Sequence, residues 1–528
     1  MEAKDLKEEY DYVIIGSGFG GSVSALRLAE KGYSVLVIEQ GKRWEAKDFG
    51  KTNWNLRKWL WMPALRWFGI QKVTVLKETS IMSGVGVGGG SLVYANTLPK
   101  PKSGFFNHGS WSKLDNWEEK LSPFYDLAWK MLGAEVNPKL FEADLALQKA
   151  ANAYGRPETF EPTKVSVHFG EAGKTIDDPY YDGKGPSRTG CTHCGECMTG
   201  CRHNAKNTLD KNYLYLAEKL GVDILPEHKV LDVIPQGKEG EDGYEIEFKQ
   251  ITSWFYAKKK KIKTKGVVFS GGVIGTVNLL LNIKEKSLPN LSERLGHMIR
   301  TNNESLILCT TSDNEKTLSD GIAIGSILEI DDHTHVEPTR YGKGSGIWRL
   351  GMMPMVSEPN FFLRMIKLLI LPFRKDFFKW LKVFLIKDYG KSTIILLVMQ
   401  HLDSTLRFEK GTIGPFKSSI EEGKAPTAFI PEAHKYAKGY SKVIDGKAQV
   451  IATETIFGTP STAHILGGCS MGEDASKGVI DSKNRVFGYK NMYVFDGSMI
   501  SANPGVNPSL SITAISEMGM SHIPNKGA

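Results

Sequence analysis

Apolar and polar positions near the start of the chain follow the order strand, turn, helix, strand. Residues 12–15 form an apolar run that predicts a buried strand, 22–31 have helical spacing, and 35–38 predict a second buried strand. Another apolar run enters a Gly-Gly turn at 267–275. Between about 300 and 455 the pattern changes to alternating strands, which favours an antiparallel sheet.

A chain of 528 residues exceeds what one compact core usually accommodates, so the pattern predicts two domains. The expected fold is α/β (mixed α+β), with a Rossmann-type domain that carries an inserted antiparallel-sheet substrate domain. The Rossmann-type domain is assigned residues 1–100, 205–300 and 455–528, and the inserted substrate-binding or cap domain is assigned residues 101–204 and 301–454.

The composition is that of an ordinary globular protein, with 41% hydrophobic and 24% charged residues and a net charge of +8. No zinc-finger, basic-zipper or RNA-recognition signature is present, so nucleic acid is not an expected partner. The N-terminus lacks the pattern of a secretory signal peptide, and no run of 18 apolar residues predicts a membrane span. These features predict a cytoplasmic protein.

A glycine motif lies between the first strand and its helix. Gly16 permits a tight turn, Gly18 lets the backbone approach a pyrophosphate, and Gly21 allows close packing of helix on strand. Glu39 ends the second strand, where an acidic side chain can accept hydrogen bonds from ribose hydroxyls. The order of these elements predicts a dinucleotide site, although the motif alone does not distinguish FAD from NAD.

Four of the six cysteines lie within eleven positions, at Cys191, Cys194, Cys197 and Cys201. The spacing is that of a bacterial-ferredoxin iron–sulfur run, although Arg202 stands where proline usually follows. The alternatives are a structural zinc site, helped by His193 or His203, and a reduced packing cluster without metal.

Three further segments carry a family resemblance. The glycine-rich loop at 83–91 and the strand-turn-helix at 267–280 resemble the two signatures of glucose–methanol–choline (GMC) oxidoreductases, with Gly271 where alanine is more usual. The tail from His464 to Pro508 resembles the active-site segment of the cholesterol oxidase-like branch. The resemblance spans almost the whole chain and fades between about 300 and 450.

The resemblance implies FAD, and because His108 and the other histidines give no clear covalent site, non-covalent FAD is expected. Val230 would meet the adenine through its backbone, and Asp496 and Gly497 would hold the ribityl chain. Along the flavin and pyrophosphate it would place Gly88, Gly89, Gly90 and Ser91.

The resemblance also implies oxidation of a secondary alcohol on a hydrophobic, sterol-like substrate. His464 would take the hydroxyl proton while hydride leaves for flavin N5, a role that suits a side chain titrating near neutrality. Asn507 would orient the hydroxyl and the flavin, and Pro508 would begin a helix whose N-terminus faces the charge on the reduced flavin. The alternative for His464 alone is a core histidine.

Two electron acceptors follow from these motifs. A plain oxidase would pass electrons to oxygen. An iron–sulfur centre would instead favour an alcohol or sugar dehydrogenase that delivers electrons to a quinone or another acceptor.

Residues 361–387 interleave apolar side chains with seven Lys or Arg and one Asp, at roughly helical spacing broken at Pro372. This pattern favours a helix in a membrane interface, so peripheral membrane contact is expected there. Residues 53–72 have a similar character, and for them an interfacial helix and a core helix remain equally supported. The alternative for both stretches is a domain interface.

Overall fold

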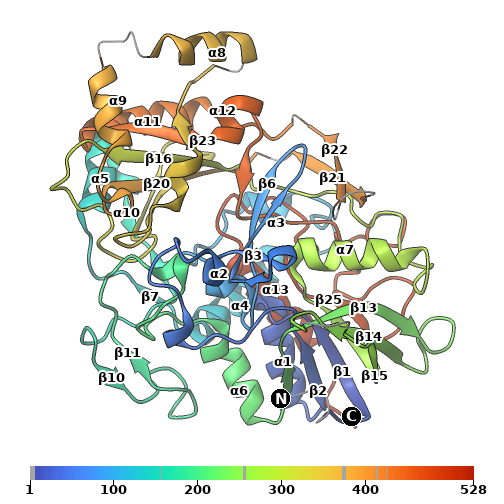
Figure 1. Cartoon of the computed structure of the whole chain (residues 1–528). Coiled ribbons are helices and arrows are strands. Elements are labelled where there is room, and N and C mark those ends of the chain that lie inside the picture. The colour runs from blue at the N-terminus through green and yellow to red at the C-terminus, as the bar shows by residue number, and fades with distance from the viewer. Residues whose placement is uncertain are drawn as a thin grey trace.

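The computed structural model describes residues 6–527 except 155, 254–256, 359, 372–375, 403, 412–413, 415 and 424. The mixed α/β fold expected from the sequence is confirmed, with one mostly parallel sheet and one antiparallel sheet (Figure 1). The first sheet takes its strands from 9–38, 223–269 and 492–494, and the second takes its strands from 161–162 and 305–451.

The first sheet contains the predicted Rossmann strands. Its spatial order is β12 (Asp223–Leu225), β2 (Val35–Ile38), β1 (Glu9–Ile15), β15 (Lys260–Phe269), β14 (Tyr244–Gln250) and β13 (His228–Pro235), with β25 (Met492–Val494) beside the last residues of β15. β12, β2, β1, β15 and β25 pair in parallel, whereas β13 and β14 are antiparallel. Every residue of β2 is buried, as expected for a parallel strand inside a sheet with helices on its faces.

Helices α1 (Phe19–Glu30), α6 (Tyr213–Lys219), α13 (Ser509–Ser521) and α4 (Trp117–Met131) pack in a chain of contacts: α6 on α1, α1 on α13, and α13 on α4. Glu517 on α13 forms an ion pair with Arg27 on α1 at 2.7 Å and accepts a hydrogen bond from the Tyr213 hydroxyl at 2.6 Å. These contacts fix the C-terminal helix against the first one.

The second sheet is antiparallel throughout. Its order is β19 (Met352–Pro354), β23 (Gly446–Ile451), β16 (Ser305–Thr311), β20 (Thr393–Gln400), β18 (Thr334–Thr339), β17 (Ser326–Glu329) and β8 (Glu161–Pro162). Ile307 and Leu396 face α5 (Glu142–Tyr154) and α11 (Pro431–Val443) in one core. Because side chains alternate along a strand, Leu306, Leu308 and Leu397 face the other way.

The remaining elements are short or peripheral. The helices are α2 (Leu56–Trp59), α3 (Gly104–Asn107), α7 (Gly272–Lys284), α8 (Phe361–Leu369), α9 (Phe377–Phe384), α10 (Tyr389–Ser392) and α12 (Ala452–Phe457). The strands are β3 (Trp61–Met62), β4 (Trp67–Phe68), β5 (Gln71–Val75), β6 (Ser80–Gly84), β7 (Glu135–Val136), β9 (Lys164–Val165), β10 (Thr175–Ile176), β11 (Arg188–Thr189), β21 (Thr405–Lys410), β22 (Phe416–Glu422) and β24 (Ser461–Thr462). The division of the chain into domains at 101, 205, 301 and 455 stays a prediction.

The two basic, aromatic stretches differ in structure. Residues 53–72 form α2 and short strands, with Trp59 and Trp61 buried, rather than one amphipathic helix. Residues 361–387 contain α8 and α9, which lie at the top of the molecule in Figure 1, while the predicted break at Pro372 lies outside the described residues. Among the described helices, none combines the length and the apolar character needed to span a bilayer.

Candidate functional site

A cavity of about 600 Å³ lies where the carboxyl ends of the parallel strands meet the antiparallel sheet. Ligands of open α/β sheets bind at this edge. Most of the residues predicted for the cofactor and for catalysis line it: Gly16, Gly18, Glu39, Gly89, Gly90, Val230, His464, Asp496, Gly497, Asn507 and Pro508. Gly21, Gly88 and Ser91 do not line the cavity.

The first glycine turn has the geometry that its residues predict. Gly16 has a φ of +101°, and a Cβ there would lie 2.4 Å from the Ser270 carbonyl oxygen. A Cβ on Gly21 would lie 2.2 Å from the Gly16 carbonyl oxygen, so Gly21 permits close packing. At Gly18 the nearest atom would be 3.9 Å away, which leaves its backbone open to the cavity.

Glu39 is buried at the end of β2 and is already held by donors. Its carboxylate accepts hydrogen bonds from the Ser17 amide at 3.1 Å, the Ser17 hydroxyl at 2.8 Å and the Gly41 amide at 2.8 Å. Each carboxylate oxygen can accept more than one hydrogen bond, so capacity for a ligand hydroxyl remains. Burial raises the pKa of Glu39, and these hydrogen bonds act against that rise.

The second glycine loop touches the first. A Cβ on Gly89, whose φ is +52°, would lie 2.7 Å from the Gly18 Cα. The backbones of the two glycine loops are therefore in direct contact at these residues. Ser91 supports the loop from outside the cavity, because its hydroxyl donates to the Gly88 carbonyl oxygen at 2.7 Å and accepts from the Leu209 amide at 3.1 Å.

Asp496 is buried where β25 leads into the last part of the chain. Its carboxylate accepts hydrogen bonds from the Ser498 amide at 2.8 Å, the Ser498 hydroxyl and the Thr276 hydroxyl at the start of α7. Gly497 beside it lines the same cavity. These contacts join the two segments that resemble the second family signature and the active-site tail.

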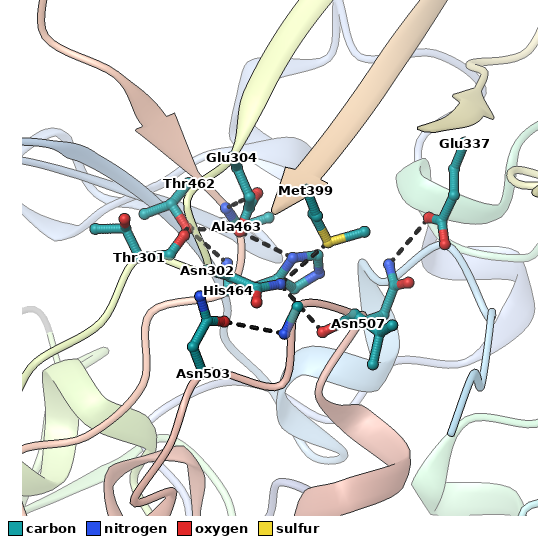
Figure 2. Close-up of polar contacts among 12 residues, drawn as sticks. Thr301, Asn302, Glu304, Glu337, Met399, Thr462, Ala463, His464, Asn503 and Asn507 are labelled. Atoms are coloured by element: carbon teal, nitrogen blue, oxygen red, sulfur yellow. Dashed lines mark hydrogen bonds and ion pairs between the residues drawn. The ribbon is translucent and has the colours of Figure 1, made fainter. Parts of the chain in front are cut away.

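His464 faces a carboxylate that the sequence did not indicate. Its Nδ1 lies 2.9 Å from Glu304 Oε1, and the Glu304 side chain is fully buried (Figure 2). Burial alone would lower the pKa of His464, but Glu304, with a smaller contribution from Glu337, outweighs this effect, so the pKa lies above its ordinary value. Since Nδ1 faces Glu304, Nε2 is the ring nitrogen left for a ligand in the cavity.

Asn507 also pairs with a buried carboxylate. Its Nδ2 donates a hydrogen bond of 3.2 Å to Glu337 Oε2, and Glu337 Oε1 lies 3.6 Å from His335 Nε2. Glu337 lies on β18, two residues before Thr339, which lines the cavity. The structure therefore brings His464 and Asn507 to one cavity, each with a carboxylate behind it.

The N-terminus of α13 opens onto the same cavity. Pro508 is the N-cap and the helix begins at Ser509, one residue later than predicted. Pro508, Ser509 and Ile512 line the cavity. The amide groups and the dipole at this end of the helix can stabilise a negative charge.

The opposite wall of the cavity is apolar. It is formed by the inward-facing side chains of the antiparallel sheet and its neighbours: Leu306, Leu308, Ile324, Met352, Ile395, Leu397 and Ile451.

The cysteine segment borders the cavity through Met198. All four cysteines are free thiols, and burial raises the pKa of Cys194 to about 12 and raises the pKa of Cys191 and Cys197 as well. Within the described residues, the group whose ligand atoms come close enough for a single ion is Cys194, Glu196 and His203. Arg202 forms an ion pair with Glu196 at 2.8 Å.

The four thiols therefore do not form a single-ion site in the part of the chain that the structure describes. The predicted iron–sulfur cluster gains no support and stays a prediction, and the predicted zinc alternative retains only a partial ligand set with His203. Lys206 holds this segment to the glycine loop, because its Nζ donates to the carbonyl oxygens of Leu92, Tyr94 and Cys197 at 2.9 to 3.1 Å.

Sequence reasoning missed Glu304 and Glu337. Glu304 directly precedes the apolar strand β16, and Glu337 lies inside β18, where every residue is buried. A charged residue within or beside a buried strand is the signal that could have indicated them, because such residues are rarely fully buried unless paired.

Comparisons with known proteins agree with these motifs. Residues 186–289 and 429–516 match the GMC oxidoreductase family profiles, and residues 14–44 match an NAD(P)-binding Rossmann-like domain. A cholesterol oxidase from Acinetobacter baumannii is 44% identical over 98% of this chain and 95% of its own length. A cholesterol oxidase from Mycobacterium tuberculosis is 41% identical over 99% of this chain and 92% of its own.

More distant relatives show how far the fold extends. A long-chain-alcohol oxidase from Arabidopsis thaliana is 24% identical over 95% of this chain and 65% of its own length. The crystal structure of pyridoxine 4-oxidase from Mesorbium loti superposes with a TM-score of 0.59 at 14% identity, covering 97% of this chain and 98% of that one. At that identity the structural similarity shows the fold alone.

Proposed function

Since the chain belongs to the GMC oxidoreductase family and is an FAD-dependent alcohol oxidoreductase, we propose that it oxidises a hydrophobic, sterol-like secondary alcohol to the ketone. The observation that carries this proposal is the cavity, in which an apolar wall faces His464 and Asn507. A sterol has one hydroxyl on a large apolar body, so it matches a cavity that combines apolar side chains with His464 and Asn507. The two cholesterol oxidase relatives support the same substrate class.

The residues that line the cavity fit FAD. Gly18 is open to the cavity, Gly89 packs directly on it, and neither has a side chain that would fill the space of a pyrophosphate. Glu39 would accept ribose hydroxyls and Val230 would lie at the adenine, while Asp496 and Gly497 would hold the ribityl chain. The FAD would be bound non-covalently. Bound FAD supplies the acceptor for the hydride.

His464 Nε2 would take the hydroxyl proton of the substrate as the carbinol hydrogen leaves with its electron pair. This assignment is supported by the carboxylate at Nδ1, which leaves Nε2 for the substrate and favours the protonated ring that results. Asn507 would orient the hydroxyl without competing for the proton. The N-terminus of α13 would stabilise the negative charge that reduction leaves near it.

Oxygen is the electron acceptor that the cholesterol oxidase relatives favour. A quinone or another acceptor reached through an iron–sulfur centre is the second candidate. Its supporting observation is the contact of the cysteine segment with the cavity through Met198. The two acceptors are distinguished by whether oxygen is consumed in step with ketone formation.

Peripheral membrane contact is proposed for α8 and α9. Phe362, Leu369 and Phe378 are each 74% exposed, and further apolar side chains beside them are also exposed. Arg364 holds α8 onto α12 by donating to the carbonyl oxygens of Thr455 and Ile456. An exposed, ring-rich apolar face beside lysines is typical of helices that lie in a bilayer interface, where a sterol substrate also resides.

Anaerobic absorption spectra of the purified flavoprotein test the reaction. Addition of cholesterol should bleach the bound flavin, whereas glucose should leave it oxidised, and admission of oxygen should restore the oxidised spectrum with release of hydrogen peroxide. His464→Ala should retain FAD and the fold but lose about 100- to 10,000-fold in the rate of bleaching. Flavin reduction by sugars alone, or at an unchanged rate in His464→Ala, would contradict the substrate class or the base, respectively.

A further inference from the structure

The Glu304 carboxylate is surrounded by donors from the segment that carries His464. Oε1 accepts a hydrogen bond from the Thr462 hydroxyl at 2.8 Å and lies 2.9 Å from His464 Nδ1, and Oε2 accepts from the Ala463 amide at 3.1 Å. Three consecutive residues therefore contact one carboxylate. Figure 2 shows this arrangement, with His464 between Glu304 and the segment of Asn507.

Thr462 completes the support of the histidine. Its hydroxyl oxygen accepts from the His464 backbone amide at 2.9 Å and also lies 3.0 Å from the Thr301 carbonyl oxygen. Both the ring and the backbone of His464 are thus tied to residues just before β16. This contact joins the catalytic segment to the antiparallel sheet that forms the apolar wall.

Glu304 differs from Asp144, another fully buried carboxylate, in the nature of its partner. Asp144 is paired with Arg340 at 2.7 Å, with both side chains fully buried, and Arg340 carries a permanent charge. In the described part of the chain, the basic side chain at ion-pair distance from Glu304 is His464. Histidine is charged only after it takes a proton, so the attraction between these two residues grows when the proton arrives.

We propose that Glu304 is the positioning residue of the alcohol oxidation: its carboxylate holds His464 with Nε2 toward the cavity and stabilises the imidazolium formed when His464 accepts the substrate proton. This role rests on the proposed function of His464 as the base. The carboxylate itself exchanges no proton with the substrate. Its contribution is orientation and charge, as for the carboxylate behind the histidine of a serine protease triad.

The pH dependence follows from the charge of Glu304. Because Glu304 raises the pKa of His464 above its ordinary value, the acidic limb of the wild-type rate profile should lie above about pH 6.5. Without that negative charge, burial of the ring lowers its pKa against only the smaller opposing effect of Glu337. The acidic limb should then move to lower pH while the plateau rate falls, since a less basic and less well oriented ring accepts the proton more slowly.

The test is Glu304→Gln, which keeps the shape and one acceptor oxygen, for either Thr462 or Ala463, but removes the charge. The rate constant of anaerobic flavin reduction by cholesterol should fall about 100-fold, KM should change little, and the acidic limb should shift to lower pH. Glu454→Gln is the matched control. Burial raises the pKa of Glu454 to about 8, no basic side chain of the described residues pairs with it, and its variant should keep the wild-type rate and profile.

Glu304→Asp provides a second variant, because it retains the charge with a shorter reach. Glu304→Asp should keep the acidic limb near that of the wild type and should lose plateau rate. This result tests the role of Glu304 even if Glu304→Gln does not fold. An unchanged rate and acidic limb in Glu304→Gln with full FAD would overturn the role of Glu304. Flavin reduction that survives in His464→Ala would instead overturn the proposed base, so the two failures are distinguishable.

Discussion

Asn507 and Glu337, 170 residues apart in the sequence, meet through a hydrogen bond of 3.2 Å from Nδ2 to Oε2. Both side chains are buried, and Glu337 is fully buried. The amide is a donor to the carboxylate, so its carbonyl oxygen Oδ1, which has no hydrogen-bond partner among the described residues, is left for another group. The contact fixes which end of the amide faces each neighbour.

Asn507→Ala should lower the rate of flavin reduction by cholesterol about 10- to 100-fold, because orientation of the reacting hydroxyl is lost. It should also destabilise the protein, since Glu337 would remain buried without its donor. Stopped-flow absorbance and thermal unfolding measure the two effects. The double variant Asn507→Ala with Glu337→Gln should recover stability but not rate, and a recovery of both would show that Asn507 acts only through Glu337.

Glu39→Ala should weaken FAD binding about 10- to 100-fold, the range expected for loss of hydrogen bonds to a charged group. The variant also releases Ser17 and Gly41, which shape the first glycine turn. Purified protein should contain less than one FAD per chain, and added FAD should restore it. Glu45→Ala, which removes an exposed carboxylate nearby, should retain full FAD. One FAD per chain in purified Glu39→Ala would show that Glu39 is not needed for FAD binding.

Substitution of Phe362, Leu369 and Phe378 by serine should abolish co-flotation with vesicles, because it removes the most exposed apolar side chains of α8 and α9. Turnover of cholesterol in vesicles should fall, while turnover of detergent-dispersed cholesterol should not change. Phosphatidylcholine vesicles with and without phosphatidylserine separate apolar insertion from attraction to anionic lipid. Leu220→Ser, an exposed leucine elsewhere, is the control. Equal flotation of all variants would argue that the surface meets a protein instead.

Iron, acid-labile sulfide and zinc should be measured in anaerobically purified protein. An iron–sulfur cluster predicts near-equal iron and sulfide that Cys194→Ser removes while flavin reduction by substrate continues. Cys309→Ser removes a buried thiol outside the cluster and should leave the metal content unchanged. Full turnover by protein that contains no iron, sulfide or zinc would show that the four cysteines only pack against their neighbours. It would also favour an oxidase that passes electrons directly to oxygen.

Local patterns in the sequence were sufficient for the Rossmann strands. The apolar run at 35–38 corresponds to β2, and the run at 12–15 lies within β1. By contrast, α4 begins at Trp117, which is buried and stacked on Trp111, a tertiary contact that periodicity does not reveal. Proline within a helix usually marks a start, and here it lies inside α4.

The residues of the site also fall into two groups, those that the sequence predicts and those that it does not. His464 and Asn507 lie in a segment whose glycines and order carry a family pattern, so they could be predicted. Glu304 and Glu337 reach them only through the packing of the antiparallel sheet on the tail of the chain. That packing joins residues about 160 positions apart, and no local spacing encodes it.

The late position of β25 and α13 has a consequence for biosynthesis. β25 inserts beside β15 in the first sheet, and α13 supplies both the packing on α1 and the helix end at the cavity. The nascent polypeptide cannot assemble the flavin pocket until these residues have left the ribosome, although the strands that begin the sheet emerge first. Cofactor capture is therefore expected only after residues 492–521 have been synthesised, and until then the edge of β15 that pairs with β25 stays unpaired.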